Sequence, residues 1–235
     1  MPVEEDIGKA YETYYTHQDQ DMSAVARLVA GLVERLRAAR YAAEFGYPVR
    51  TSILTRAASK LAASLVPRFA VNADCSIMYA PFRPGGRILE VGVGSGQTLK
   101  RLQDLGWLVE GIDVDEKAVE NANKKGLSVS CGSLGAQKYP DRCFDAVAMS
   151  HVIEHLHDVR GVLAECRRIL SAGGKLVMVT PNSASWGHRM CRDNWMPLDP
   201  PRHLHLFNSA NLARLCHEAG FRDVKTFATI RGADG

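Results

Sequence analysis

Short apolar segments alternate with amphipathic segments along the chain from Arg87 onward. Five segments are almost entirely apolar and predict strands at residues 87–91, 107–112, 127–131, 144–149 and 175–180. Between and after them, apolar residues at helical spacing predict helices at about 96–105, 115–125, 158–171 and 209–219. Because apolar strands separated by helices form parallel sheets covered on both faces, we expect an α/β fold. Its sheet is expected to be Rossmann-like, doubly wound and mostly parallel.

The first part of the chain has a different pattern. Residues 22–45 place five aliphatic side chains at helical spacing, namely Val25, Leu28, Val29, Leu32 and Leu36. Residues 51–69 predict a second helix that ends at Pro67, and the turn FRPGG at 82–86 leads into the first strand. We therefore expect a helical N-terminal extension over residues 1–82 and the α/β domain over residues 83–235.

Composition and charge are those of an ordinary globular protein, with 46% hydrophobic and 23% charged residues. The formal net charge of +3 is small and the basic pairs are isolated, so charge gives nucleic-acid binding no support. Six cysteines lie far apart without a C-x-x-C pair, which is typical of reduced thiols in a cytoplasmic protein. The polar N-terminus is unlike a secretory signal, and no apolar run reaches the length of a membrane span.

The turn after the first strand, EVGVGSG at residues 90–96, has a glycine at every second position. Its G-x-G-x-G spacing differs from the G-x-G-x-x-G of dinucleotide-binding proteins, because Gln97 stands where the last glycine would be. The turn also lacks the Gly-Lys-Ser/Thr ending of a Walker phosphate loop. Asp113 ends the second strand, where a carboxylate accepts hydrogen bonds from ribose hydroxyls. Together these features predict a ribosyl ligand at the carboxyl edge of the sheet.

Four segments in this order resemble the class I S-adenosylmethionine-dependent methyltransferases: LEVGVGSG, GIDVDEKAVENA, FDAVAMSHVIEHLHD and ILSAGGKLVMVTPN. More narrowly, they resemble the branch that contains the ubiquinone-biosynthesis O-methyltransferases. The resemblance covers about residues 85–222 and implies S-adenosyl-L-methionine as the cofactor. Dehydrogenases, which also carry glycine-rich turns after a strand, are the structural alternative.

For the methionine end of the cofactor, the resemblance implies roles for four residues of this turn. Gly92 and Gly94 let the backbone pass close to the ligand, and the helix start near Gly96 receives the ligand's carboxylate. Glu90 resembles the family acid that orients the loop and, often through water, the amino group.

For the adenosine end, the resemblance implies that Asp113 binds the ribose hydroxyls and that Val114 lies against the adenine. Ser133 and Leu134 stand where the family usually has an acidic residue facing the adenine amine, so a hydroxyl replaces a charged partner. Ser150, together with His151, is expected to line the reactive side of the cofactor.

The stretch HVIEHLHD at residues 151–158 contains H-x-x-E-H, which is also the inverted zinc-protease pattern. That interpretation needs one helix carrying both histidines, whereas this stretch follows a strand end, where a Glu-His pair is a family feature. Some relatives, including ubiquinone-type O-methyltransferases and enzymes that methylate the 3′-terminal 2′-hydroxyl of small RNAs, hold a divalent metal with an E-x-x-E-H motif. In this chain His151 stands in place of the first Glu of that motif, which replaces one of the oxygen ligands that Mg²⁺ prefers with a nitrogen ligand. His203 or His205 is a further candidate ligand. We assign no metal ligand and keep metal dependence as an alternative.

A long segment rich in Trp, Pro and His follows the fifth strand at residues 181–207, and loops of this kind are usually functional. Its aromatic residues are candidates either for the walls of an apolar acceptor pocket or for packing on the sheet edge: Trp186, Trp195 and Phe207. The N-terminal extension is expected to form a lid over the same pocket with Tyr14, Tyr15 and His17.

These features predict a methyltransferase that acts on a small molecule, at oxygen rather than nitrogen or carbon. A hydroxyl acceptor benefits from a base, for which His151 is the first candidate and His155 and His205 are the next. A metal-assisted RNA 2′-O-methyltransferase and a non-catalytic cofactor-binding module are the alternatives.

The end of the chain differs from the family pattern, in which a final strand inserts antiparallel into the sheet. After the last predicted helix the sequence has one strand candidate, residues 221–230, followed by RGADG. We expect either that the chain is part of a longer protein or that another element takes the place of the final strand.

Overall fold

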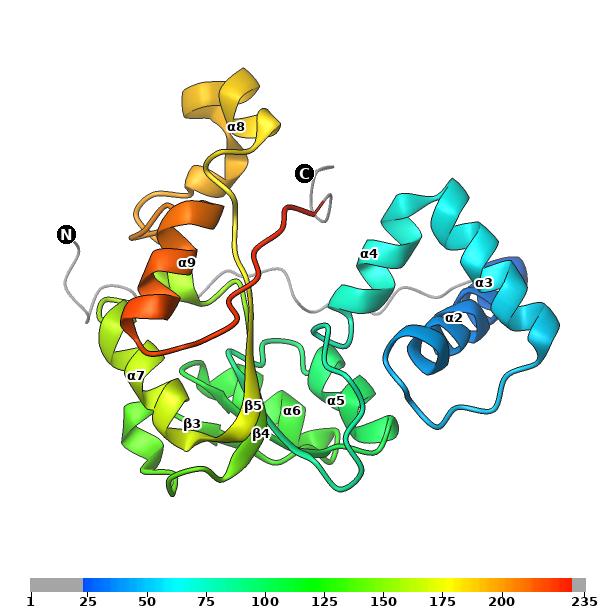
Figure 1. The fold of residues 1–235 in the computed structure, drawn as a ribbon, viewed down its shortest axis with the longest axis horizontal. Coiled ribbons are helices and arrows are strands. Elements are labelled where there is room, and N and C mark those ends of the chain that lie inside the picture. The colour runs from blue at the N-terminus through cyan, green and yellow to red at the C-terminus, as the bar shows by residue number, and fades with distance from the viewer. Residues whose placement is uncertain (1–22, 230–235) are drawn as a thin grey trace.

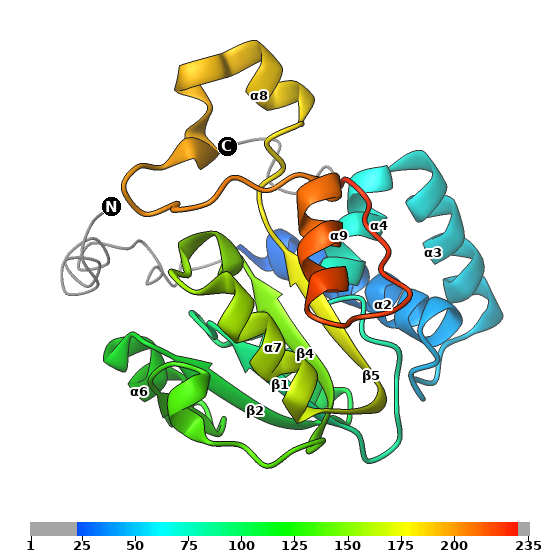
Figure 2. The same cartoon turned by 60° about the vertical axis from the view of Figure 1, so that its left-hand side comes forward.

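The computed structural model describes residues 23–229, which contain one sheet of five parallel strands in the order β3-β2-β1-β4-β5 (Figures 1 and 2). The strands are β1 Arg87–Val91, β2 Leu108–Asp113, β3 Val129–Cys131, β4 Phe144–Ser150 and β5 Leu170–Val179. The chain winds outward from β1 to β3 and then returns to place β4 beside β1. The winding therefore switches between β1 and β4, as the doubly wound α/β prediction requires, and this prediction is confirmed.

Helices cover both faces of this sheet because successive strand residues point to opposite sides. On one face, α5 (Gln97–Asp104) and α6 (Glu116–Lys124) pack through Leu99 and Ala122 against β3. On the other face, α7 (Val159–Ile169) packs through Cys166 and Ile169 in a core that includes Leu89. The last helix, α9 (Ser209–Glu218), packs beside α7 and over β5 (Figure 2).

Capping residues set the helix starts close to their predicted positions. The Asp115 carboxylate accepts a hydrogen bond from the Lys117 amide at 2.9 Å at the start of α6. Asp158 accepts one from the Gly161 amide at 2.8 Å at the start of α7. Asn208 and Asn211 form a reciprocal capping box at the start of α9.

Three helices form the N-terminal extension: α2 (Ala24–Glu44), α3 (Ile53–Leu65) and α4 (Pro67–Cys75). Pro67 ends α3 as predicted, but it also occupies the first turn of α4, which the sequence pattern did not predict. Proline is tolerated there because the first amides of a helix have no intrahelical acceptor. Of the predicted lid, Tyr14, Tyr15 and His17 lie outside the described residues.

The extension is joined to the sheet by a shared core. Tyr47 and Ile77 are buried together with Ile88 of β1 and Trp107. The Trp107 indole N–H donates to the Tyr47 hydroxyl at 2.9 Å, and that hydroxyl donates to the Ala80 carbonyl at 2.9 Å. Burial raises the pKa of Tyr47 to about 12, so the phenol remains a neutral donor in this core.

One predicted boundary and one strand candidate differ from the structure. Strand β5 begins at Leu170, directly after α7, rather than at residue 175. Leu170 pairs with Phe144 of β4, and the next pair is Lys175 with Ala146. The intervening segment SAGG is therefore accommodated as a bulge. Residues 221–229 form no strand. Their apolar residues recur every third position, at Phe221, Val224 and Phe227, whereas a half-buried strand requires every second position.

Within residues 23–229, no helix is both long and apolar enough to cross a membrane. All six cysteines are free thiols, as the sequence predicts, although Cys131 and Cys191 are exposed.

Candidate active site

The glycine-rich turn and the carboxyl ends of β1, β2 and β4 border one cleft. Most residues that the sequence assigns to the cofactor line it: Gly92, Gly94, Asp113, Val114, Ser133, Leu134 and Ser150. His151 and His155 line the same cleft. Two assigned residues are not among the lining residues, because Gly96 is buried at the start of α5 and Glu90 is buried beneath the turn.

The glycines of the turn are required for different reasons. Gly92 and Gly94 have φ angles of 77° and 52°, a region that L side chains rarely adopt. A Cβ at Gly92 would lie 2.4 Å from a methyl carbon of Val152, so this glycine is fixed by packing within the protein. A Cβ at Gly94 would meet no atom within 4 Å, which leaves the backbone open toward the cleft. The expected close approach of a ligand therefore fits Gly94 rather than Gly92.

Asp113 ties the glycine-rich turn to the end of β2. One carboxylate oxygen accepts the Gly94 amide at 2.8 Å and the other accepts the Asp115 amide at 2.9 Å. Each oxygen retains a further lone pair, so the carboxylate can also accept from ribose hydroxyls. Beside it, Val114 is 71% exposed at the cleft edge, where a side chain is available to contact a flat ring.

Glu90 is 3% exposed and lies below the turn. Burial, aided by the nearby Asp113 charge, raises its pKa to about 8 against the opposing effect of a hydrogen bond from the Leu99 amide. Its second carboxylate oxygen has no hydrogen-bond partner among the described residues. Since an unpartnered buried oxygen is rare, this atom fits the amino group of S-adenosylmethionine, reached directly or through water.

The adenine side is less polar than in the family pattern. Leu134 is 3% exposed and belongs to the core beside α7, while it also borders the cleft. Ser133 is exposed next to it. The residues present therefore fit a cofactor whose ring is held by apolar contact and at most one uncharged hydrogen bond.

His151 lies at the carboxyl end of β4 in a left-handed conformation, with φ of 56°. Its amide donates to the Val179 carbonyl at 2.8 Å, which fixes this backbone against β5. Its Nδ1 lies 3.3 Å from a carboxylate oxygen of Glu154, and its side chain is 53% exposed in the cleft. The imidazole is therefore both accessible and oriented.

Glu154 is 1% exposed, and its other carboxylate oxygen accepts a hydrogen bond from the Thr180 hydroxyl at 2.9 Å. Burial opposes ionisation of this carboxyl, but His151 and Thr180 together hold its pKa below the ordinary value. Thr180 was not singled out from the sequence. Its position directly after β5 could have identified it, because ligands bind at this edge of a doubly wound sheet.

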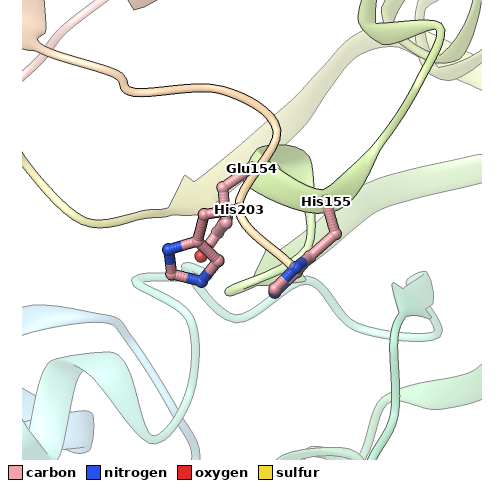
Figure 3. Close-up of side chains that lie close together, drawn as sticks. All are labelled: Glu154, His155 and His203. Atoms are coloured by element: carbon pink, nitrogen blue, oxygen red, sulfur yellow. The ribbon is translucent and has the colours of Figure 1, made fainter. Parts of the chain in front are cut away.

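Glu154, His155 and His203 converge from two segments far apart in the sequence (Figure 3). Their potential ligand atoms all lie within 4.8 Å of one another. Backbone carbonyls hold Nδ1 of each ring: Arg202 at 3.0 Å from His155, and Pro197 at 2.6 Å from His203. Burial lowers the pKa of His155, which favours the neutral imidazole. Two imidazoles and one carboxylate thus lie together, a ligand set suited to a divalent transition metal.

Other candidates are separated from the cleft. His205 is not among the lining residues, and its Nε2 lies 2.9 Å from the Leu156 carbonyl. The zinc-protease interpretation is wrong, because residues 151–158 contain only the short 3₁₀-helix η3 (Ile153–His155) before α7.

The three aromatic residues of the 181–207 segment have different positions. Trp186, at the start of α8 (Trp186–Cys191), is 74% exposed, whereas Phe207 is 4% exposed and packs in the core between α7 and α9. Trp195 alone of the two tryptophans lines the cleft, and His188 stacks on it with ring centroids 4.6 Å apart. Of the three predicted wall residues, Trp195 and Phe207 border the cleft, whereas Trp186 does not.

Comparisons with known proteins agree with this geometry. A family model described as a methyltransferase domain matches residues 54–226. A protein of Mycolicibacterium smegmatis, named a probable S-adenosylmethionine-dependent methyltransferase, is 33% identical over 151 residues, which cover 63% of this chain and 57% of that protein. The ubiquinone biosynthesis O-methyltransferase of Thiobacillus denitrificans is 31% identical over 150 residues, which cover 58% of this chain and 64% of that protein. The chain thus spans little more than half the length of the mycobacterial relatives that it matches.

Solved structures show the same fold. A methyltransferase of Thermotoga maritima, described as a possible histamine N-methyltransferase, superposes with a TM-score of 0.55 at 27% identity, covering 71% of this chain and 78% of that one. The phosphoethanolamine N-methyltransferase 2 of Haemonchus contortus, solved with S-adenosyl-L-methionine, shares the fold with a TM-score of 0.52 at 20% identity, covering 65% and 37%. With its glycine-rich turn, its acid after β2 and a family match over most of its length, the chain belongs to the methyltransferase domain family as a class I S-adenosylmethionine-dependent member.

Proposed function

We propose that this chain transfers the methyl group of S-adenosylmethionine to an oxygen of a small molecule. The observation that carries the proposal is that His151, half-exposed and oriented by Val179 and Glu154, borders the same cleft as Gly94 and Asp113. One of the relatives, a ubiquinone biosynthesis O-methyltransferase, supports oxygen as the accepting atom.

In the proposed mechanism, the bound cofactor supplies a methyl group on an activated sulfonium. Glu90, Gly94 and Asp113 hold the cofactor, and Trp195 borders the place where an acceptor enters. With the hydroxyl oxygen of the acceptor aligned on that methyl group, His151 would take the hydroxyl proton. Alignment of these atoms supplies much of the rate, because the methyl donor is already reactive.

The test has two stages. Calorimetric titration with S-adenosylhomocysteine is expected to show one site, and absence of binding at millimolar ligand would contradict the assignment of the cleft. Incubation with labelled S-adenosylmethionine and cell extract, followed by identification of the labelled product, is then expected to give a methyl ether. A labelled amine, or binding without any methyl transfer, would reject O-methylation and favour N-methylation or a cofactor-binding module respectively.

Replacing His151 with alanine is expected to lower turnover at least about tenfold, while the affinity for S-adenosylhomocysteine changes little. The reason is that the imidazole acts on the acceptor proton and not on the cofactor. His217→Ala, which removes an exposed histidine on α9, is the control and is expected to retain full activity. Wild-type turnover of the His151 variant would remove this residue from the mechanism.

Metal-assisted methylation, including RNA 2′-O-methylation, is a second candidate because Glu154, His155 and His203 lie together. In that case the two imidazoles and the carboxylate would hold the ion, which would supply Lewis-acid activation of the accepting hydroxyl. Activity lost after chelation and restored by a divalent ion would favour this candidate, whereas unchanged activity would reject it.

A further inference from the structure

The outer surface of the α2–α3 hairpin has an unusual share of exposed aliphatic side chains. Nine of the sixteen large apolar residues that are exposed in the described chain fall between Val25 and Val66. Isolated exposed apolar residues are normal, but a concentration of them marks an interaction surface.

These side chains form one row on each helix. Val25, Leu28 and Leu32 follow one side of α2 and are 72%, 77% and 56% exposed. Leu54, Leu61 and Leu65 follow one side of α3 and are 82%, 60% and 72% exposed. The two helices contact each other through different sides. For example, the Ser59 hydroxyl of α3 donates a hydrogen bond to the Leu36 carbonyl of α2 at 2.8 Å. The hairpin stands beside the sheet with α4 connecting it to the domain (Figure 1).

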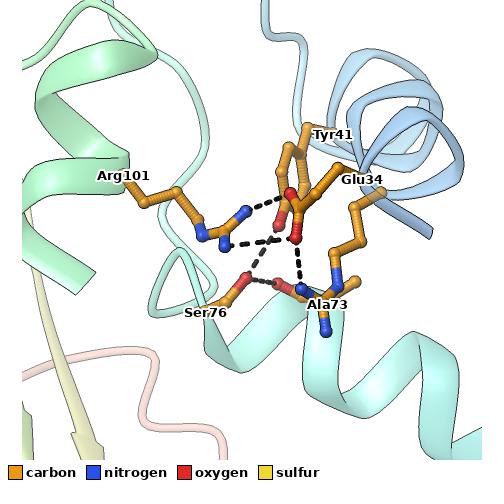
Figure 4. A network of polar contacts seen from close by, with 6 residues as sticks. Glu34, Tyr41, Ala73, Ser76 and Arg101 are labelled. Atoms are coloured by element: carbon orange, nitrogen blue, oxygen red, sulfur yellow. Dashed lines mark hydrogen bonds and ion pairs between the residues drawn. The ribbon is translucent and has the colours of Figure 1, made fainter. Parts of the chain in front are cut away.

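The same part of the chain is strongly basic. Residues 23–75 contain eight basic and three acidic side chains, a net charge of +5, whereas the whole chain carries +3. Two of the acids are neutralised internally: Glu34 binds Arg101 of α5 at 2.6 Å (Figure 4), and Asp74 binds Arg40 at 2.6 Å. Arg27, Arg35 and Lys60 are exposed and have no acidic partner among residues 23–229. The hairpin therefore presents aliphatic and positively charged groups together.

We propose that the α2–α3 hairpin is a docking surface for an anionic lipid membrane. Aliphatic rows enter the headgroup region while arginine and lysine side chains meet acidic headgroups, as in amphipathic helices that lie in the membrane interface. The proposed attachment is peripheral, because no helix within residues 23–229 is long and apolar enough to span a bilayer. It does not depend on which acceptor is methylated.

The charge and the side-chain types of the hairpin favour a membrane over a second copy of the chain or a nucleic acid. A second copy of the chain would place two surfaces of charge +5 against each other, which is unfavourable. A nucleic acid would match the charge but leave the aliphatic rows in water, since the exposed large apolar residues of the hairpin include no aromatic ring for base stacking. The acidic residues 1–22 of the same chain are the remaining alternative.

The test is co-sedimentation of the full chain with vesicles of phosphatidylcholine alone or of equal parts phosphatidylcholine and phosphatidylglycerol. The wild-type chain is expected to bind the anionic vesicles at least about tenfold more strongly, and salt at about 1 M is expected to weaken this binding by screening. The variant Leu28→Gln, Leu32→Gln, Leu61→Gln, Leu65→Gln is expected to lose binding at least about tenfold. The variant Arg27→Gln, Arg35→Gln, Lys60→Gln is expected to lose only the preference for anionic lipid.

A matched control removes three exposed basic residues elsewhere, Lys138, Arg142 and Arg214, and is expected to bind vesicles as the wild type does. Unchanged circular dichroism and S-adenosylhomocysteine affinity would show that the variants are folded. Failure of the wild-type chain to bind either vesicle would overturn the proposal, as expected if residues 1–22 cover the hairpin. A dimer that the leucine variant converts to monomer, or vesicle-independent binding of an RNA oligonucleotide through the hairpin, would overturn it as well.

Discussion

The protein without ligand is expected to lose stability as the pH rises from about 5 to about 8, and Glu90→Gln is expected to remove much of this loss. The folded state raises the pKa of Glu90 from 4.5 to about 8, mainly through burial. A raised carboxyl pKa means that the folded chain binds the proton more tightly than the unfolded chain. Its contribution to stability is therefore complete below about pH 4.5 and disappears as the pH rises through about 8. The shift corresponds to a change on the order of 5 kcal/mol in the free energy of unfolding.

Urea unfolding at about pH 5 and about pH 8 measures this effect in both proteins. Glutamine keeps an acceptor for the Leu99 amide but carries no titrating proton, so its pH dependence is expected to be smaller than that of the wild type. Glu120→Gln is the control, because Glu120 is exposed and pairs with Lys124 on the surface of α6. Equal pH dependence in the wild type and the Glu90 variant would show that this carboxyl does not titrate as the structure indicates.

Replacing Asp113 with alanine is expected to weaken S-adenosylhomocysteine binding at least about a hundredfold, or about 2.7 kcal/mol. Two losses combine here. The ribose hydroxyls lose their proposed acceptor, and the Gly94 amide, which donates to Asp113 at 2.8 Å, loses the contact that holds the turn against β2. Asp113→Asn is expected to bind with intermediate affinity, because the amide keeps one acceptor oxygen but presents a donor on its other side.

The adjacent Asp115 offers a matched control for this experiment. Its carboxylate caps α6 by accepting from the Lys117 amide at 2.9 Å. Asp115→Asn removes the same charge while keeping a good capping residue, so cofactor affinity is expected to stay within about threefold of the wild type. An Asp113→Ala variant that binds S-adenosylhomocysteine as tightly as the wild type would exclude a role for this carboxylate in the ribose site.

Local patterns in the sequence predict the strands of the sheet well, and they single out the residues proposed for the cofactor. Strands such as 144–149 are predicted within one residue, because a buried parallel strand needs a continuous apolar run. The turn 90–96 and Asp113 are identified from spacing, since a strand, a tight turn and a helix impose fixed positions on short segments. The boundary between α7 and β5 is not predicted, because the bulge in SAGG depends on pairing with β4.

The acceptor side of the cleft depends on contacts between distant segments. His203 reaches Glu154 because the Leu204 and His205 amides both donate to the Glu154 carbonyl, at 2.8 and 3.2 Å. Trp186 and Phe207 look equivalent in sequence, yet one is 74% exposed and the other 4%. No local spacing distinguishes such positions, because packing against α7 and α9 determines them.

In the α2–α3 hairpin, too, local sequence patterns predict the helix but not which of its side chains are buried. Helical spacing in residues 22–45 correctly predicts an amphipathic helix, α2. Burial of its apolar side is a separate matter, because it requires a partner surface, and the tertiary structure leaves Val25, Leu28 and Leu32 exposed. By itself, the sequence determined the doubly wound sheet, the glycine-rich turn and the acid that faces it, since each depends on neighbours a few residues away. Only the tertiary structure decided which histidines meet Glu154 and which apolar side of a helix remains in water, since those outcomes depend on packing between elements separated by tens of residues.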